Sequence, residues 1–119
     1  MYAALGTQPD ICAAVQALSP FAAMFGREHI EGIKHIFRYL AGTMNRGIVY
    51  TAGGGELVGY TDADWANDAM NWKSVSGNVF LLSGGAISWM SKQQTNIADS
   101  STYAEYIAAA EAAKELVWL

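Results

Sequence analysis

Apolar positions in the first 46 residues recur at the spacing of helices. The first set predicts a helix that opens near Pro9 and stops at Ser19–Pro20. The second set predicts a helix over residues 27–41, with charged residues between the apolar ones. Its apolar positions are Ile30, Ile33, Phe37 and Leu40. No strand pattern precedes these two helices, so residues 1–46 are predicted to form a helical segment.

From residue 47 the pattern changes to that of strands. Short strands are predicted over Ile48–Tyr50, Leu57–Ala63, Gly77–Ser83 and Ala86–Ser91. The last two are separated by Gly84–Gly85, and this arrangement predicts a β-hairpin. A final helix is predicted from Thr102 to the end of the chain. Successive strands followed by a helix predict an α+β domain over residues 47–119, in which the helix covers one face of the sheet.

Composition limits what this chain does by itself. Of its 119 residues, 52% are hydrophobic and only 15% are charged, so part of its surface is expected to pack against other polypeptide. The formal net charge of −4 gives no basic footprint for nucleic acid. The single cysteine, Cys12, excludes an internal disulfide. The sequence shows no signal-peptide pattern and no apolar run of ~20 residues, so an intracellular location, cytoplasmic or nuclear and without a membrane, is expected.

Asp62 is an acidic residue near the end of a predicted strand. By strand alternation it shares a face with Val58 and Tyr60, and Asp64 falls on the same side if the strand continues. Two interpretations are open for Asp62: a turn residue at the strand end, or a carboxylate placed there for a metal ion.

Glu105 is the second acidic residue that departs from a simple amphipathic pattern. Helical winding places it on the side of Ala109 and Ala112, opposite Glu111 and Glu115. A carboxylate facing a small-residue stripe needs a partner, because an unpaired buried charge is costly, and a cation shared with Asp62 would be one. The alternative is local: residues 102–105 match a capping box in which the glutamate binds the first free amide of the helix.

Four strings around these acids carry a family resemblance. They are Gly59–Ala66, Ser74–Phe80, Gly84–Trp89 and Ser100–Ala108. In order and spacing they resemble the ribonuclease H region of copia-type retrotransposon Pol polyproteins. Two earlier strings, Thr7–Ile11 and Phe37–Thr43, are similar to the segment that joins reverse transcriptase to that region.

The resemblance implies an incomplete ribonuclease H-like fold over residues 47–119, with residues 1–46 as a helical connection from the reverse transcriptase side. It implies metal-dependent hydrolysis of the RNA strand of an RNA–DNA hybrid, with two Mg²⁺ or Mn²⁺ ions about 4 Å apart. Asp62 and Glu105 correspond to the first two catalytic metal ligands. The reverse transcriptase portion of the same polyprotein is the implied protein partner.

The resemblance also implies that the intact nuclease needs more than these residues. The third acidic ligand of the family comes from a strand beyond the last helix of this chain, so the fragment by itself is expected to be inactive. A catalytically dead scaffold or packing module is the alternative. Lys92 is the cation best placed to meet a phosphate. The tryptophans at positions 65, 72 and 89 are expected to pack in a core or at an edge rather than to stack on bases.

Overall fold

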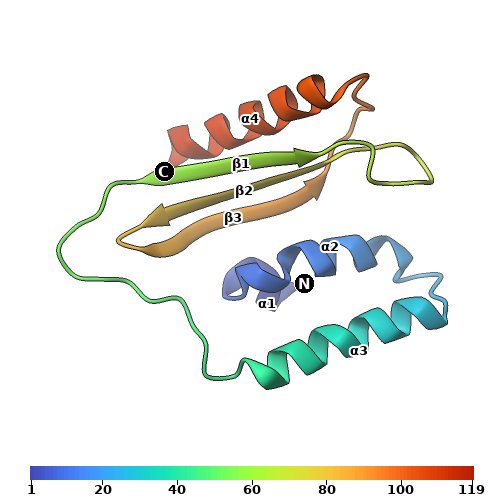
Figure 1. Cartoon of the computed structure of the whole chain (residues 1–119), viewed down its shortest axis with the longest axis horizontal. Coiled ribbons are helices and arrows are strands. Elements are labelled where there is room, and N and C mark those ends of the chain that lie inside the picture. Colours follow the sequence, from blue (N-terminus) through green and yellow to red (C-terminus); the bar gives the residue numbers. More distant parts are fainter. The chain divides into compact units, whose positions relative to one another are not determined.

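The computed structural model describes all residues from 1 to 119, and the chain forms two compact units. The first unit is Met1–Ile48 and the second is Val49–Leu119. Figure 1 shows helices alone in the first unit, and a sheet with one helix in the second. The predicted α+β fold, with helices followed by an antiparallel sheet and a C-terminal helix, is confirmed.

Short helices and one long helix build the first unit. They are α1 (Tyr2–Gly6), a 3₁₀ turn (Pro9–Ile11), α2 (Cys12–Leu18), a second 3₁₀ turn (Ser19–Phe21) and α3 (Arg27–Gly42). The sequence pattern predicted α2 and α3 but not α1. Ala4, Ile11 and Cys12 are the buried residues of this unit. The apolar stripe of α3 stays largely in solvent, and Phe37 is 66% exposed.

The second unit contains a three-stranded antiparallel sheet in the order β1-β2-β3. Its strands are β1 (Val58–Asp64), β2 (Val75–Leu82) and β3 (Gly85–Gln93). The predicted hairpin of β2 and β3 is confirmed, but its turn lies one residue earlier than expected, at Ser83–Gly84. Both residues have positive φ, 53° and 81°, as a two-residue turn matched to the twist of the strands requires.

The strand predicted over Ile48–Tyr50 is wrong. This segment makes no ladder with the sheet and instead lies against the hairpin turn. The Tyr50 hydroxyl donates to the carbonyl oxygen of Ala86 at 2.6 Å, and the Thr51 amide donates to the carbonyl oxygen of Ser83 at 2.8 Å. Tyr50 and Thr51 therefore contact the hairpin at the end of the sheet without extending it.

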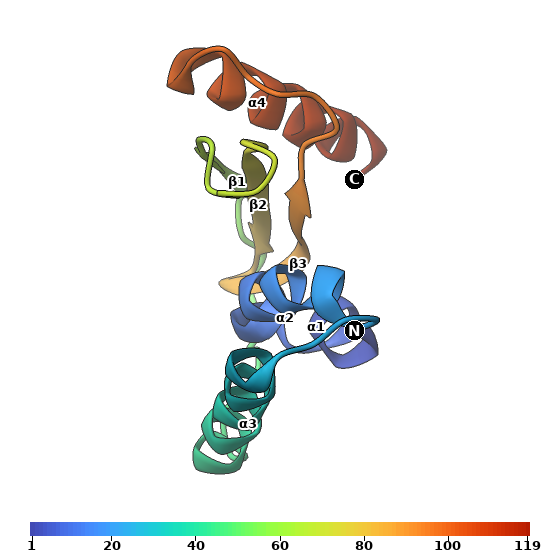
Figure 2. The same ribbon diagram turned by 90° about the vertical axis from the view of Figure 1, so that its right-hand side faces the viewer.

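The helix α4 (Ser101–Trp118) lies over β1 and β2, as Figures 1 and 2 show. Its buried residues are Ala104, Ala108 and Ala112, at helical spacing of four. Small side chains at these positions let the helix backbone approach the sheet closely. The opposing residues of β2 are Ser76, Asn78 and Phe80, which alternate with half-buried ones.

The side of α4 that faces the sheet differs from the predicted one. Glu105 is exposed beside the buried stripe rather than on it. Glu111 and Glu115, which the sequence placed on the side opposite Glu105, are half-buried toward the sheet. The charges along α4 did not reveal this side because the contact is made by alanines, which carry no strong amphipathic signal.

Candidate functional site

Asp62 lies within β1, two residues before its end, and its Cα pairs with that of Gly77 in β2. The adjacent β1 residues Thr61 and Ala63 pair with residues whose side chains face α4. By alternation the Asp62 side chain lies on the other face of the sheet, where it is exposed. The interpretation of Asp62 as a turn residue is therefore wrong, because the residue is part of the ladder. Asp64 ends β1 on the same face.

Glu105 is an exposed carboxylate in the second turn of α4. The N-cap of this helix is Ser100, whose hydroxyl oxygen accepts a hydrogen bond from the amide of Tyr103 at 3.2 Å. A capping-box glutamate would have to stand at position 103, so Glu105 is not one. Its exposure also removes the argument that Glu105 needs a partner because it is buried. Only its position and the family resemblance remain as reasons to consider it for a metal.

Asp62 and Glu105 lie toward the same end of the second unit. β3 runs parallel to β1, and the short connection from β3 brings the start of α4 to the end of β1 (Figure 1). The two carboxylates belong to different layers, however, and the Asp62 side chain lies on the sheet face away from α4. No group of three histidine, cysteine, aspartate or glutamate side chains in the structure could hold a metal ion. The structure thus offers two exposed oxygen donors, which suit a hard cation, and not a complete metal centre.

A structured loop follows Asp64 at this end of the sheet. The carboxylate of Asp68 accepts hydrogen bonds from the Met70 amide at 2.9 Å and from the Gln93 side-chain amide at 2.7 Å. The Met70 hydrogen bond, helped by those of Gln93 and Asn71, holds the pKa of Asp68 below its ordinary value. These hydrogen bonds tie the loop to the end of β3.

The tryptophans of this region are more exposed than predicted. Trp72 is 65% exposed and has a positive φ of 57°, so it does not pack in a core, and packing at an edge stays a prediction for it. Trp65 is 49% exposed, although its indole nitrogen donates to the Ala98 carbonyl oxygen at 3.0 Å. Trp89 is half-buried.

Lys92 is exposed on β3, which is an edge strand. Its Cα pairs with that of Ser76, and this pairing places it on the sheet face that α4 covers. Its role in phosphate binding stays a prediction.

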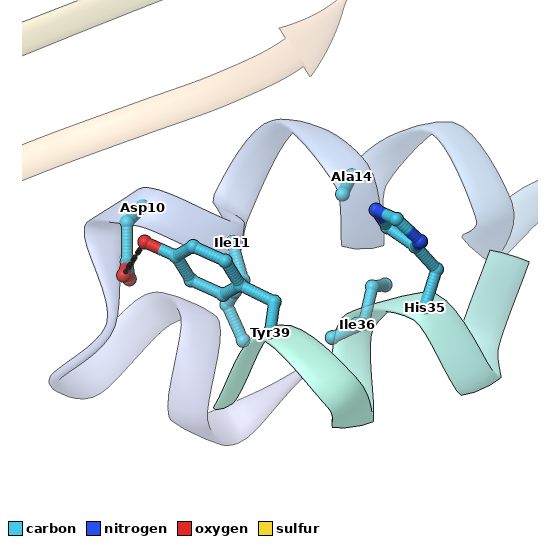
Figure 3. Close-up of a pocket in the computed structure, with 6 residues that line it drawn as sticks. All are labelled: Asp10, Ile11, Ala14, His35, Ile36 and Tyr39. Atoms are coloured by element: carbon cyan, nitrogen blue, oxygen red, sulfur yellow. Dashed lines mark hydrogen bonds between the residues drawn. The ribbon is translucent and has the colours of Figure 1, made fainter. Parts of the chain in front are cut away.

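The first unit has a hollow of about 200 Å³ between its helices (Figure 3). Its lining residues are Asp10, Ile11, Ala14, His35, Ile36 and Tyr39. The Tyr39 hydroxyl donates to the Asp10 carboxylate at 2.7 Å, and this hydrogen bond raises the pKa of Tyr39. With a single carboxylate that is already paired, the hollow is not a second metal centre.

Another polar cluster lies under α4 and was missed by sequence reasoning. Asn78, Ser88, Glu111 and Glu115 line a cavity of about 140 Å³ at the boundary of α4, β2 and β3. The only sequence signal was a pair of glutamates four residues apart on the side of α4 opposite Glu105. The tertiary structure alone brings the strand residues to them.

Three known proteins define what the chain is similar to. It is 48% identical, over 120 residues, to secreted RxLR effector protein 161 of Plasmopara viticola, a match that covers 100% of this chain and 84% of that protein. It is 50% identical over 119 residues to the retrovirus-related Pol polyprotein from transposon TNT 1-94 of Nicotiana tabacum, and 44% identical over 114 residues to that from transposon RE1 of Arabidopsis thaliana. The chain belongs to the family of these proteins and is homologous to copia-type retrotransposon Pol polyproteins.

The Pol match extends over nearly the whole chain but only a small part of each polyprotein. It covers 100% and 95% of this chain, against 9% of the TNT 1-94 polyprotein and 8% of the RE1 polyprotein. The activities of the whole polyproteins therefore do not transfer to this chain by similarity alone. Neither a protein-family model nor a solved structure matches the chain. None of its helices combines the length and apolar character needed to cross a membrane.

Proposed function

We propose that this chain is part of the ribonuclease H region of a copia-type Pol polyprotein, with its helical unit as the connection from the reverse transcriptase side. The observation that carries the proposal is the homology to Pol polyproteins along both units of the chain. The α+β architecture of the second unit supports it. Asp62 on β1 and Glu105 on α4 also lie toward one end of the sheet, although the Asp62 side chain is on the face away from α4.

In the intact parent, Asp62 and Glu105 are two of the carboxylates that hold a pair of Mg²⁺ or Mn²⁺ ions. Bound ions would supply an activated water and stabilise the leaving oxygen when the RNA strand of an RNA–DNA hybrid is cut. The residues of this chain provide oxygen donors from a rigid strand and a rigid helix. Lys92, exposed on the edge strand β3, is the proposed phosphate contact.

This chain by itself is proposed to be inactive on a hybrid. Two carboxylates in different layers are too few to fix two metal ions, and further ligands would come from elsewhere in the polyprotein. The net charge of −4 gives the chain little attraction for the phosphate backbone. An intracellular location belongs to the same proposal, whereas the name of the Plasmopara viticola relative describes that protein as secreted.

A manganese titration followed by NMR tests the ligand assignment. Mn²⁺ bound between Asp62 and Glu105 would broaden the amide signals of these two residues first and saturably. Asp62→Asn and Glu105→Gln should each remove the effect, whereas Asp64→Asn, on the same sheet face, should leave it. A folded chain whose Asp62 and Glu105 signals stay sharp would contradict the metal role.

A nuclease assay tests the rest of the proposal. The purified chain should not cleave an RNA–DNA hybrid in Mg²⁺ or Mn²⁺. A chain extended with the following polyprotein sequence should cleave it, and Asp62→Asn should abolish that cleavage.

A catalytically dead scaffold is the second candidate function. The observation in its favour is that the Asp62 side chain lies on the sheet face away from α4, the helix that carries Glu105. In that case the extended chain would remain inactive with Mg²⁺. It would bind the reverse transcriptase portion of the polyprotein equally well with or without Asp62→Asn.

A further inference from the structure

The cavity of about 140 Å³ under α4 does not include Asp62 or Glu105. It is lined by Asn78, Ser88, Trp89, Met90, Glu111 and Glu115. Asn78 lies on β2 and Ser88 on β3, while the two glutamates come from the second half of α4. Strand and helix side chains thus bring oxygen atoms from three elements to one place.

Two of these oxygen atoms are buried without a hydrogen-bond partner. Asn78 is only 9% exposed, and its Oδ1 accepts no hydrogen bond. Glu111 Oε2 is likewise buried and accepts none. Buried acceptors are normally satisfied, because leaving one unpaired costs the full desolvation penalty of the group. An electron-poor partner in the cavity would satisfy both.

Glu115 adds a second carboxylate that is held in place. The Ser88 hydroxyl donates to Glu115 Oε1 at 2.6 Å, which fixes the carboxylate and leaves its other oxygen available. Glu111 and Glu115 are one helical turn apart on the same face of α4, a spacing at which like charges repel. A positive charge between them would turn this repulsion into attraction.

We propose that Asn78, Glu111 and Glu115 form a binding site for a hard divalent cation, with Ca²⁺ as the best match. Two carboxylates and one amide oxygen are typical Ca²⁺ ligands, and Ca²⁺ accepts the irregular geometry that a helix and a strand impose, with waters completing its shell. Ser88 acts as a positioning residue through its hydrogen bond to Glu115. The site is independent of the proposed nuclease ligands, and its effect is to fasten α4 to β2.

The test uses the full chain carrying both Asp62→Asn and Glu105→Gln, so that those two residues contribute nothing. After chelator treatment, Ca²⁺ is titrated by calorimetry and thermal unfolding is followed with and without it. We expect one saturable equivalent and a higher Tm in Ca²⁺. Adding Glu111→Gln should abolish both effects, and adding Ser88→Ala should weaken binding by about 10–100-fold, the usual loss when a residue that orients a ligand is removed.

One further measurement keeps the outcome decisive. In the same background without Glu111→Gln, Mn²⁺ should broaden the amide signals of Asn78 and Glu111 before any others.

A folded chain that shows no saturable Ca²⁺ binding would overturn the proposal. Binding seen with Asp62 and Glu105 intact but lost in the double variant would also overturn this site, while supporting the proposed nuclease ligands.

Discussion

Single residues at the start of α4 determine whether the Glu105 carboxylate caps the helix or stays exposed to solvent. The hydroxyl of Ser100, and not that of Thr102, caps the helix, so the helix begins earlier than the apparent capping box at residues 102–105 would place it. That shift of two residues leaves Glu105 in the second turn, exposed and available to solvent. Whether Glu105 is a cap or a candidate ligand thus depends on which of several neighbouring hydroxyl groups binds a free amide.

Replacing Ser100 by alanine should destabilise the second unit by about 1 kcal/mol, because the Tyr103 amide loses its acceptor. Thermal or urea unfolding followed by circular dichroism measures this loss. Ser101→Ala is the matched control, since Ser101 is the first residue inside the helix and alanine favours helix. Equal losses from both variants would mean that Ser100 is not the cap.

The pKa of Asp68 should lie below its ordinary value, because its carboxylate accepts hydrogen bonds from the Met70 amide and Gln93. A lowered folded-state pKa gives stability that is present above the unfolded pKa. This stability is lost as the pH falls through the folded pKa, so the loop should loosen only in acid. An NMR pH titration of the carboxyl carbons measures the value, and Gln93→Ala should move it upward. A normal Asp68 pKa would contradict the hydrogen bonds.

At the scale of elements, the contact between β1 and β2 depends on a glycine. A Cβ added at Gly59 would lie 2.6 Å from the ring of Phe80, which is only 3% exposed. The ring therefore occupies the space above the strand where a side chain would stand. The sheet face under α4 is built from this close approach and from the alanine stripe of the helix.

Gly59→Ala should destabilise the second unit by about 1–3 kcal/mol, since the buried Phe80 ring must move to admit a methyl group. Gly77→Ala is the control within the same sheet: its nearest contact would be the Met90 carbonyl oxygen at 3.9 Å. That variant should be neutral or slightly stabilising, because glycine weakens a strand. Chemical denaturation of both proteins gives the comparison, and equal stabilities would rule out the close packing.

At the scale of the whole molecule, the chain is two units joined near residue 48. Residues 46–50 form neither helix nor strand, whereas Tyr50 and Thr51 are already hydrogen-bonded to the hairpin. Arg46 therefore lies at the junction, outside α3 and before the contacts of the second unit begin.

Limited trypsin digestion should cut first after Arg46, giving products of residues 1–46 and 47–119. Lys73 and Lys92 should be cut later, because the former lies in a hydrogen-bonded loop and the latter in a strand. Mass spectrometry of early time points identifies the products, and Arg46→Gln should remove the early cut. First cleavage at Lys73 or Lys92 would mean that the second unit is not compact.

The sequence by itself determined the identity and order of the main elements. Helical spacing was sufficient for α2, α3 and α4, and strand spacing with a glycine turn was sufficient for β1 and the hairpin, because these signals are local. The sequence also identified Asp62 and Glu105 as candidate metal ligands. Only the tertiary structure decided which residues form the turn, since cross-strand pairing and the bulge between Phe80 and Leu81 fix the register. Only the tertiary structure shows that α4 packs on the sheet through its alanines. This contact leaves Glu105 exposed and places Glu111 toward Asn78. No local pattern encodes that contact, because it depends on how closely a helix and a sheet can approach.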